Sequence, residues 1–152
     1  MKLSKYFTLD EMTHSNYATR HVIDNTPNKS VIDNLKYGCV NVLDRVREHV
    51  GIIHVSSGYR SKALNSAIGG RQKSQHMKGE AADIWSSTKK PRQLAKAFID
   101  ANTDYDQLIV EFDRWLHVSW TKHGSERKHL LYAYKEGGKT KYRHMTYNEL
   151  EG

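Results

Sequence analysis

Apolar residues recur at helical spacing between residues 31 and 50. They fall on one stripe of a helix with about 3.6 residues per turn. The residues of this stripe are Ile32, Leu35, Cys39, Val42, Val46 and Val50. Ser30 stands where a helix cap is expected, and Gly51 stands where a helix would end. The pattern therefore predicts one long helix from Val31 to about Val50.

A short helix is predicted closer to the N-terminus. Thr8 and Glu11 have the Thr-x-x-Glu spacing of a capping box, in which each side chain binds the backbone N–H of the other residue. This helix is expected to begin at Leu9. Residues 14–29 are polar and include Pro27, so the segment between the two helices is expected to be a loop.

After Gly51, short apolar runs alternate with turn residues, which is typical of strands. Strands are expected over residues 52–55, 81–85, 108–112, 116–120, 130–135 and 141–145. Gly137 and Gly138 indicate a hairpin between the last two strands. Two more helices are expected, over 62–68 with Ser61 as cap and from Pro91 to about Asn102. The segments 56–60 and 71–80 are expected to be a turn and a polar loop.

Helices come first along the chain, and strands mixed with helices follow. This order predicts an α+β fold, with a central and mostly antiparallel sheet flanked by helices. A chain of 152 residues suits one domain with one core. Within the single domain 1–152 we expect a helical N-terminal part over 1–50, a central part over 52–120 and a C-terminal hairpin over 121–152.

The composition is that of a globular protein, with 38% hydrophobic and 27% charged residues. No run approaches the roughly 18 apolar residues of a transmembrane helix, so no stable membrane insertion is expected. The first residues lack the apolar stretch of a secretory signal, which favours synthesis in the cytoplasm without a signal peptide. The single cysteine, Cys39, is expected to be a small buried core residue.

The formal net charge of +7 bears on possible partners. A basic surface favours polyanions such as nucleic acid, anionic lipid or an acidic cell wall. The chain has no run of five like charges and no nucleic-acid-binding signature, so nucleic acid is not expected as a partner. Two interpretations stay open: a solubilising surface and attraction to an anionic polymer.

Three potential metal ligands carry the chemistry of the chain. His76 and Asp83 lie in the segment 74–84, and His117 lies on the strand expected over 116–120. Two imidazoles and one carboxylate leave a zinc coordination position open for water, as in catalytic zinc sites. Side chains alternate along a strand, so His117 can meet an aspartate from a neighbouring strand that points to the same face. The triad indicates a zinc-dependent hydrolase if it binds metal. The alternative is a structural role, because a histidine near an acid more often has one than binds a metal, and the other histidines have no partner pattern.

Several spaced motifs around these residues agree in order with those of one family. They are Val55-Ser56-Ser57-Gly58-Tyr59-Arg60-Ser61, Leu64-Asn65, Ile68-Gly69-Gly70, Ser74-Gln75-His76, Gly79, Ala81-Ala82-Asp83-Ile84 and Trp115-Leu116-His117-Val118-Ser119. Over residues 52–120 the chain thus resembles the zinc D-Ala-D-Ala carboxypeptidase family, which shares its fold with the hedgehog signalling domain and several phage endolysins. Its N-terminal segments, Phe7 to Met12 and Asn25 to Pro27, resemble those of phage and prophage members.

The resemblance implies a role for each motif. His76, Asp83 and His117 would be the zinc ligands. Arg60 would bind the substrate carbonyl and stabilise the oxyanion that forms from it. Ser74 and Gln75 would shape the substrate pocket beside the first ligand. The implied substrate is the stem peptide of bacterial peptidoglycan.

The sequence leaves the general base open. Many members of the family carry an acid three residues before the second histidine, where this chain has Arg114. The nearby acids are Glu111 and Asp113, and Glu80 is more distant. Glu111 is favoured because it ends a strand before a hairpin turn, as in the phage-type members. A three-residue turn over 113–115 would place Glu111 on the face of the second histidine, and a two-residue turn would place it on the other face.

These observations predict a zinc metallopeptidase that hydrolyses amide bonds of peptidoglycan stem peptides, as a D,D-carboxypeptidase or an endopeptidase of the phage lysis type. We expect a monomer that acts at the cell wall after release from the cytoplasm, or as part of a virion. The departure at Arg114 leaves an alternative: a catalytically inactive, zinc-containing module that binds the wall or serves as a virion component.

Overall fold

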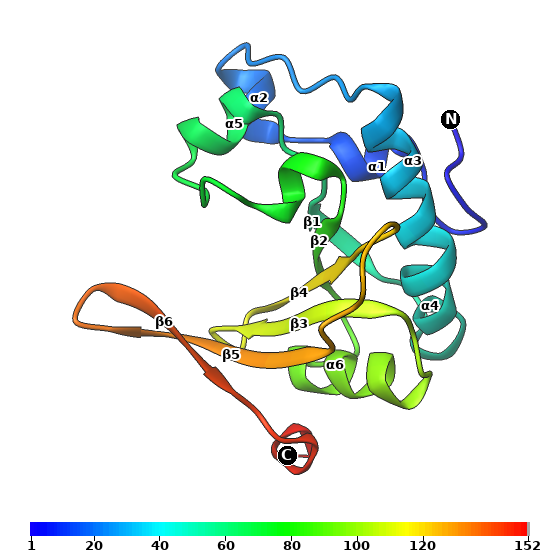
Figure 1. The fold of residues 1–152 in the computed structure, drawn as a ribbon, viewed down its shortest axis with the longest axis vertical. Helices are drawn as coiled ribbons and strands as arrows, with labels where there is room; N and C mark the ends of the chain where they lie inside the picture. The colour runs from blue at the N-terminus through cyan, green and yellow to red at the C-terminus, as the bar shows by residue number, and fades with distance from the viewer. Residues whose placement is uncertain (152) are drawn as a thin grey trace.

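A six-stranded sheet organises the fold, and the computed structural model describes residues 1–151 (Figure 1). The strands are β1 (His54–Ser57), β2 (Ala81–Trp85), β3 (Tyr105–Glu111), β4 (Trp115–Trp120), β5 (His129–Glu136) and β6 (Lys139–His144). They lie in the order β1-β2-β4-β3-β5-β6. Neighbouring strands are antiparallel except for β3 and β5, which are parallel. The predicted α+β fold with a mostly antiparallel sheet is confirmed.

Helices precede, interrupt and follow these strands. They are α1 (Leu9–Thr13), α2 (Asn16–Arg20), α3 (Lys29–Gly38), α4 (Asp44–Val50), α5 (Lys62–Ala67) and α6 (Pro91–Asp100). A π-helical turn, η1 (Cys39–Leu43), joins α3 to α4 without a break, and two short 3-10 helices are η2 (Gln75–Lys78) and η3 (Tyr147–Leu150). Figure 1 shows α3 and α4 along one side of the molecule, while α6 packs against β3 and β4.

The two faces of the sheet differ because side chains alternate along each strand. One face is apolar, and its fully buried side chains are Ala82, Ile84, Leu108, Val110, Leu116 and Val118. They belong to the same core cluster as Leu94 and Phe98 of α6. The opposite face carries Asp83 of β2 and His117 of β4. The apolar face therefore holds the domain together and leaves the polar face for chemistry.

The long helix begins two residues earlier than predicted. Its first residue is Lys29, and the Asn28 side chain accepts a hydrogen bond from the backbone N–H of Val31. Asn28 therefore takes the capping role predicted for Ser30, because a cap side chain satisfies an N–H group of the first turn.

Two segments predicted to lack regular structure contain short helices. Ser15 accepts a hydrogen bond from the N–H of Ala18 and so caps α2 inside the predicted loop 14–29. Ser74 likewise caps η2 inside the predicted loop 71–80. Strand β1 is also shifted, because it starts at His54 and includes residues 56 and 57, which were expected to turn.

Other predicted boundaries are confirmed. Helix α1 starts at Leu9 with both hydrogen bonds of the Thr8–Glu11 capping box. Gly51 ends α4 with a φ of +85°, a conformation that glycine adopts without strain. Ser61 caps α5, and β5 and β6 form the predicted C-terminal hairpin.

Trp120 connects the sheet to the helical part of the chain. Its indole is fully buried, and the indole N–H lies 3.0 Å from the carbonyl oxygen of Asn34 and 3.1 Å from that of Gly79. A Cβ added to Gly38 of α3 would lie 1.9 Å from the indole, so only glycine allows this approach. Cys39 follows in the same core, where burial raises the pKa of its thiol, in line with the predicted core role.

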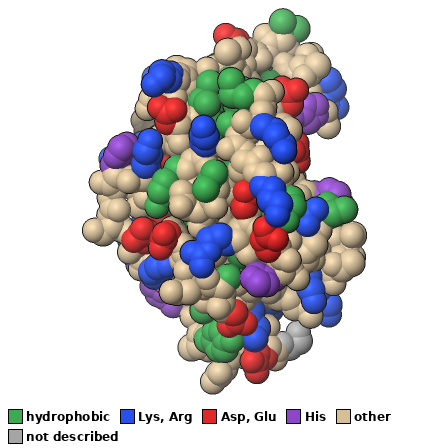
Figure 2. Space-filling model, turned by 90° about the vertical axis from the view of Figure 1, so that its right-hand side faces the viewer, with side chains coloured by type: hydrophobic (Ala, Val, Ile, Leu, Met, Phe, Trp, Pro, Cys, Tyr) green, Lys and Arg blue, Asp and Glu red, His purple; other side chains and the backbone are tan. Residues whose placement is uncertain are grey.

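Figure 2 shows how charged side chains are distributed over one face of the molecule. Basic and acidic side chains are interspersed on this face, with no large patch of one sign. The net positive charge is therefore not concentrated there. Within residues 1–151, no helix has both the length and the apolar character needed to cross a bilayer.

Candidate metal centre

Three predicted ligands meet on the polar face of the sheet. Asp83 and His117 are direct partners in the register of β2 and β4, so their side chains leave the sheet together. The Nδ1 atom of His117 lies 3.0 Å from Oδ1 of Asp83. His76 reaches the same oxygen from η2, with its Nε2 atom 3.4 Å away. The candidate ligand atoms of the three residues all lie within 4.8 Å of one another, as one metal ion requires.

The backbone around His76 fixes the orientation of its ring. Its Nδ1–H donates a hydrogen bond of 2.7 Å to the carbonyl oxygen of Gly58, which can only accept. In the neutral imidazole, which burial favours, the Nε2 atom then carries a lone pair, and it is buried without a hydrogen-bond partner. A lone pair that faces a carboxylate oxygen across 3.4 Å is unfavourable unless a cation lies between them. The residues therefore fit a divalent metal ion, and the contact to Gly58 is typical of the support that metal-binding histidines receive.

The protonation states of the cluster suit metal binding. Burial lowers the pKa of His76, which keeps its imidazole neutral near neutral pH. Burial acts to raise the pKa of Asp83, but the interactions with His76 and His117 outweigh it and hold the pKa well below its ordinary value. A neutral imidazole and an ionised carboxylate are the forms that bind a metal ion.

The two motifs that flank the centre are tied to each other through their backbones. The N–H of Arg60 donates to the carbonyl oxygen of His76 over 3.0 Å, next to the contact between His76 and Gly58. Ser74 accepts a hydrogen bond of 3.2 Å from the N–H of His76. Gly79 ends η2 in the left-handed conformation, with a φ of +73°. These local contacts place His76 above β2 and β4.

Arg60 lies next to the centre as an unpaired cation. Burial lowers the pKa of its guanidinium, while the carboxylates of Asp83 and Glu111 act in the opposite direction. Its Nε atom is buried without a hydrogen-bond partner, and no acid within residues 1–151 forms an ion pair with it. Arg60 also lines a depression of about 270 Å³ between α2 and β1. A cation held without a partner remains available to an anionic group of a ligand.

Glu111 lies on the same face of the sheet as the ligands. Strand β3 pairs Glu111 with Trp115 and Ile109 with His117, so the loop between the strands consists of residues 112–114. Neither of the two turns considered from the sequence forms, because the loop starts one residue earlier than the three-residue alternative. Its odd length still leaves Glu111 on the face of His117. Burial and the charge of Asp83 raise the pKa of Glu111.

The competing acids lie in other environments. Asp113 accepts hydrogen bonds from Arg92, at 2.8 and 3.2 Å, and from the hydroxyl of Tyr132 at 3.0 Å. The Arg92 hydrogen bond lowers the pKa of Asp113, which leaves it a poor proton acceptor. Burial raises the pKa of Glu80, but the charges that act on it come from Lys78, Asp106 and His123 rather than from the metal cluster.

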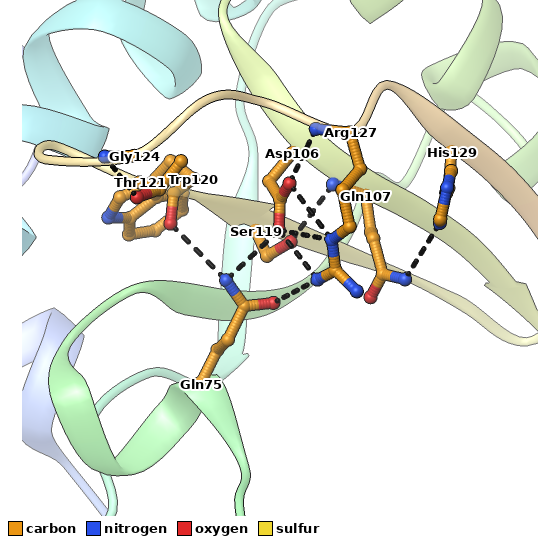
Figure 3. Close-up of polar contacts among 9 residues, drawn as sticks. All are labelled: Gln75, Asp106, Gln107, Ser119, Trp120, Thr121, Gly124, Arg127 and His129. Atoms are coloured by element: carbon orange, nitrogen blue, oxygen red, sulfur yellow. Dashed lines mark hydrogen bonds and ion pairs between the residues drawn. The ribbon is translucent and has the colours of Figure 1, made fainter.

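The side chain of Gln75 takes part in a polar network around Asp106 (Figure 3). Its Nε2 donates to Oδ2 of Asp106 over 3.2 Å and to the carbonyl oxygen of Trp120 over 3.4 Å. Arg127 binds the same carboxylate through its guanidinium, at 2.7 Å from Nη2, and through its backbone N–H. The network thus joins the residue before His76 to the irregular segment between β4 and β5. Sequence reasoning missed Asp106 and Arg127, which lie in no motif.

Replacing Asp106 with asparagine is expected to lower the free energy of unfolding by about 2 kcal/mol, because it removes the buried carboxylate that accepts hydrogen bonds from the half-exposed guanidinium of Arg127. Burial acts to raise the pKa of Asp106, but the hydrogen bonds from Arg127 outweigh it and keep the pKa below its ordinary value. The contribution to stability is therefore present above the unfolded pKa of about 4 and is lost as the pH falls through the lower folded pKa.

Urea unfolding at pH 7 and at about pH 3 checks this expectation. The difference between the wild type and Asp106→Asn should shrink at the lower pH. The exposed neighbour Asp104 offers a matched control, and Asp104→Asn should leave stability nearly unchanged at both pH values. Equal losses in the two variants would show that the network adds nothing specific.

Two imidazole nitrogens and a carboxylate that converge beside a partly buried glutamate define a candidate metallohydrolase centre. The model of the peptidase M15 family matches residues 5–119. The chain therefore belongs to the peptidase M15 family, whose members are generally zinc-dependent. A search of curated proteins found no match. Membership indicates a metallopeptidase with a peptide-type substrate, and strands β5 and β6 lie outside the matched residues.

Proposed function

We propose that this protein is a zinc-dependent peptidase that hydrolyses amide bonds in the stem peptides of peptidoglycan. The observation that carries the proposal is the convergence of His76, Asp83 and His117 on one face of the sheet, with Glu111 on the same face. Nitrogen and carboxylate donors suit zinc, and three protein ligands leave room for water or substrate. Family membership supports a peptide substrate.

In the proposed reaction, zinc bound by His76, Asp83 and His117 would supply a Lewis acid and lower the pKa of water at the site. Glu111 accepts a proton from the attacking water, whose oxygen bonds to the carbonyl carbon. Arg60 stabilises the negative charge that forms on the carbonyl oxygen. Glu111 then delivers its proton to the nitrogen as the carbon–nitrogen bond breaks. The raised pKa makes Glu111 a stronger base than an ordinary carboxylate, which favours its uptake of the proton from water.

In this proposal, Ser74 and Gln75 support the pocket and do not contact the substrate directly. Both side chains already have partners, in the backbone N–H of His76 and in the network around Asp106. We propose that they shape the pocket by holding η2, and thereby His76, in place. The substrate itself would contact Arg60 and the metal.

The position of the cleaved bond is the finer part of the proposal. A D,D-carboxypeptidase would remove the terminal D-Ala, whereas an endopeptidase would cleave within stems or crosslinks. We propose that the protein acts as a monomer at the cell wall, as a lysis enzyme of the phage type or a virion-associated hydrolase does. The +7 charge supports this site of action, since the wall is rich in anionic groups.

Mass spectrometry of the fragments released from purified peptidoglycan tests the proposal. The zinc-loaded protein should release products, and a chelator should abolish their release. Loss of a single D-Ala would identify a carboxypeptidase, and cleavage inside stems or crosslinks would identify an endopeptidase. If several wall types yield no product and the protein still sediments with the wall, the inactive binding module would replace the enzyme.

A further inference from the structure

The polar face of the sheet continues past the metal centre onto the C-terminal hairpin. Glu111 of β3 pairs with Ala133 of β5, and Ala133 pairs with Tyr142 of β6. Residues paired in register project from the same face of a sheet. Tyr142 therefore shares a face with Glu111 and with the three candidate ligands. Figure 1 shows that the turn end of the β5–β6 hairpin projects beyond β3 and β4.

Arg71 contacts this part of the hairpin from a segment distant in the sequence. Its guanidinium carbon lies 4.5 Å from the centroid of the Tyr142 ring, within the range of a cation–π contact. Arg71 belongs to the segment between α5 and η2, directly after Gly70. A Cβ added to Gly70 would lie 3.0 Å from Nη1 of Arg60, so this segment also borders the cation beside the metal centre.

The backbone of Arg71 is held in place, while its charge is left without an acidic partner. Its carbonyl oxygen accepts hydrogen bonds from the side chain of Asn65 over 2.8 Å and from the N–H of Ser74 over 3.2 Å. Arg71 is exposed, and within residues 1–151 no carboxylate forms an ion pair with it. Its guanidinium is thus positioned by a fixed backbone and by an aromatic ring, with its hydrogen-bond donors free.

The hairpin adds no negative charge on this face. Register places the following side chains there: His129, Leu131, Ala133 and Lys135 of β5, and Thr140, Tyr142 and His144 of β6. None of them is acidic, and Lys135 is a second cation without an ion pair among the described residues. A ligand that extends from the centre along the hairpin therefore meets positive charge.

From these observations we infer that Arg71, held against Tyr142, binds a carboxylate of the substrate peptide at a distance from the scissile bond. The inference rests on the proposed function and specifies its substrate as an anionic peptide. Strands β4 and β6 are three strand spacings apart, which is about 14 Å. An extended peptide covers this distance with about four residues. Arg60 and Arg71 then have separate tasks, the first at the reacting carbonyl and the second at a remote carboxylate.

Two fluorescent stem-type peptides test the inference. One carries a free glutamyl carboxylate, and the other is identical except that this group is a carboxamide. Binding is measured by anisotropy with zinc-loaded Glu111→Gln protein, and KM and kcat are measured with the active enzyme. Arg71→Ala should weaken binding of the carboxylate peptide and raise its KM by about five- to tenfold, with kcat nearly unchanged. The carboxamide peptide should respond little to the substitution.

Matched variants separate a specific contact from a loss of charge or of local structure. Lys139→Ala removes an exposed cation from the opposite face of the same hairpin, and it should leave both peptides unaffected. Tyr142→Ala should weaken binding of the carboxylate peptide in the same way as Arg71→Ala. Equal effects of Arg71→Ala on the two peptides, or no effect on either, would overturn the inference. Failure of the proposed function would appear differently, as wild-type protein that cleaves neither peptide.

Discussion

Replacing Glu111 with glutamine is expected to lower kcat by roughly 10²- to 10⁴-fold, the usual contribution of a general acid–base residue. Glutamine has nearly the same shape as glutamate but cannot accept the proton of the attacking water. Glu111 is not one of the three residues whose ligand atoms converge, so zinc binding should be retained. Turnover of a stem peptide at saturating zinc, together with the metal content of the purified variant, measures both parts of this expectation.

Asp113 provides the control for this substitution because it lies two residues away in the chain. Its carboxylate is bound to Arg92 and Tyr132 rather than directed to the metal cluster. Asp113→Asn should therefore retain most of the activity and lose at most some stability. The opposite pattern, with activity lost in Asp113→Asn and kept in Glu111→Gln, would show that Asp113 rather than Glu111 is the general base.

The sequence could identify Glu111 as a candidate but could not fix the turn that orients it. Phe112 and Asp113 have φ values of +58° and +55°, and Phe112 is not a residue that usually adopts this conformation. This turn conformation is instead accompanied by contacts with residues that are distant in the sequence. The N–H of Phe112 donates to the carbonyl oxygen of Ala133 over 3.0 Å, and Asp113 is bound by Arg92. A local pattern does not contain such contacts.

Part of the candidate metal cluster could be predicted from the sequence because two of its residues lie on regular strands. Asp83 and His117 each lie within a short apolar run that predicts a strand, and strand geometry restricts the direction of their side chains. The network of Gln75, Asp106 and Arg127 could not be predicted from the sequence. Arg127 lies in an irregular segment, and it contacts Asp106 across 21 positions of the chain without any periodic signal. Strand geometry thus allowed the meeting of Asp83 and His117 to be predicted, whereas the candidate ligand His76 lies in a segment expected to be a loop and was identified through its motif. The contacts that support it lie outside any motif.

Zinc is expected to stabilise the wild-type protein and to leave a ligand variant unaffected. At a zinc concentration about 100-fold above Kd, the free energy of unfolding should rise by about 2.7 kcal/mol. For a chain of this size, the Tm should then increase by about 5–11 °C. His117→Ala should abolish the increase, because it removes one of three ligands and leaves the lone pair of His76 Nε2 with an incomplete site. Thermal unfolding with and without zinc measures the change.

His54→Ala is the matched control, since His54 lies on β1 of the same sheet but is exposed and stacks on Trp85, with ring centroids 4.2 Å apart. This variant should keep the full zinc-dependent increase in Tm, and a chelator should reverse the increase in both the variant and the wild type. An increase that survives in His117→Ala would place the zinc elsewhere. It would also remove the observation on which the proposed peptidase activity depends, because Glu111 and Arg60 would then flank a cluster that binds no metal.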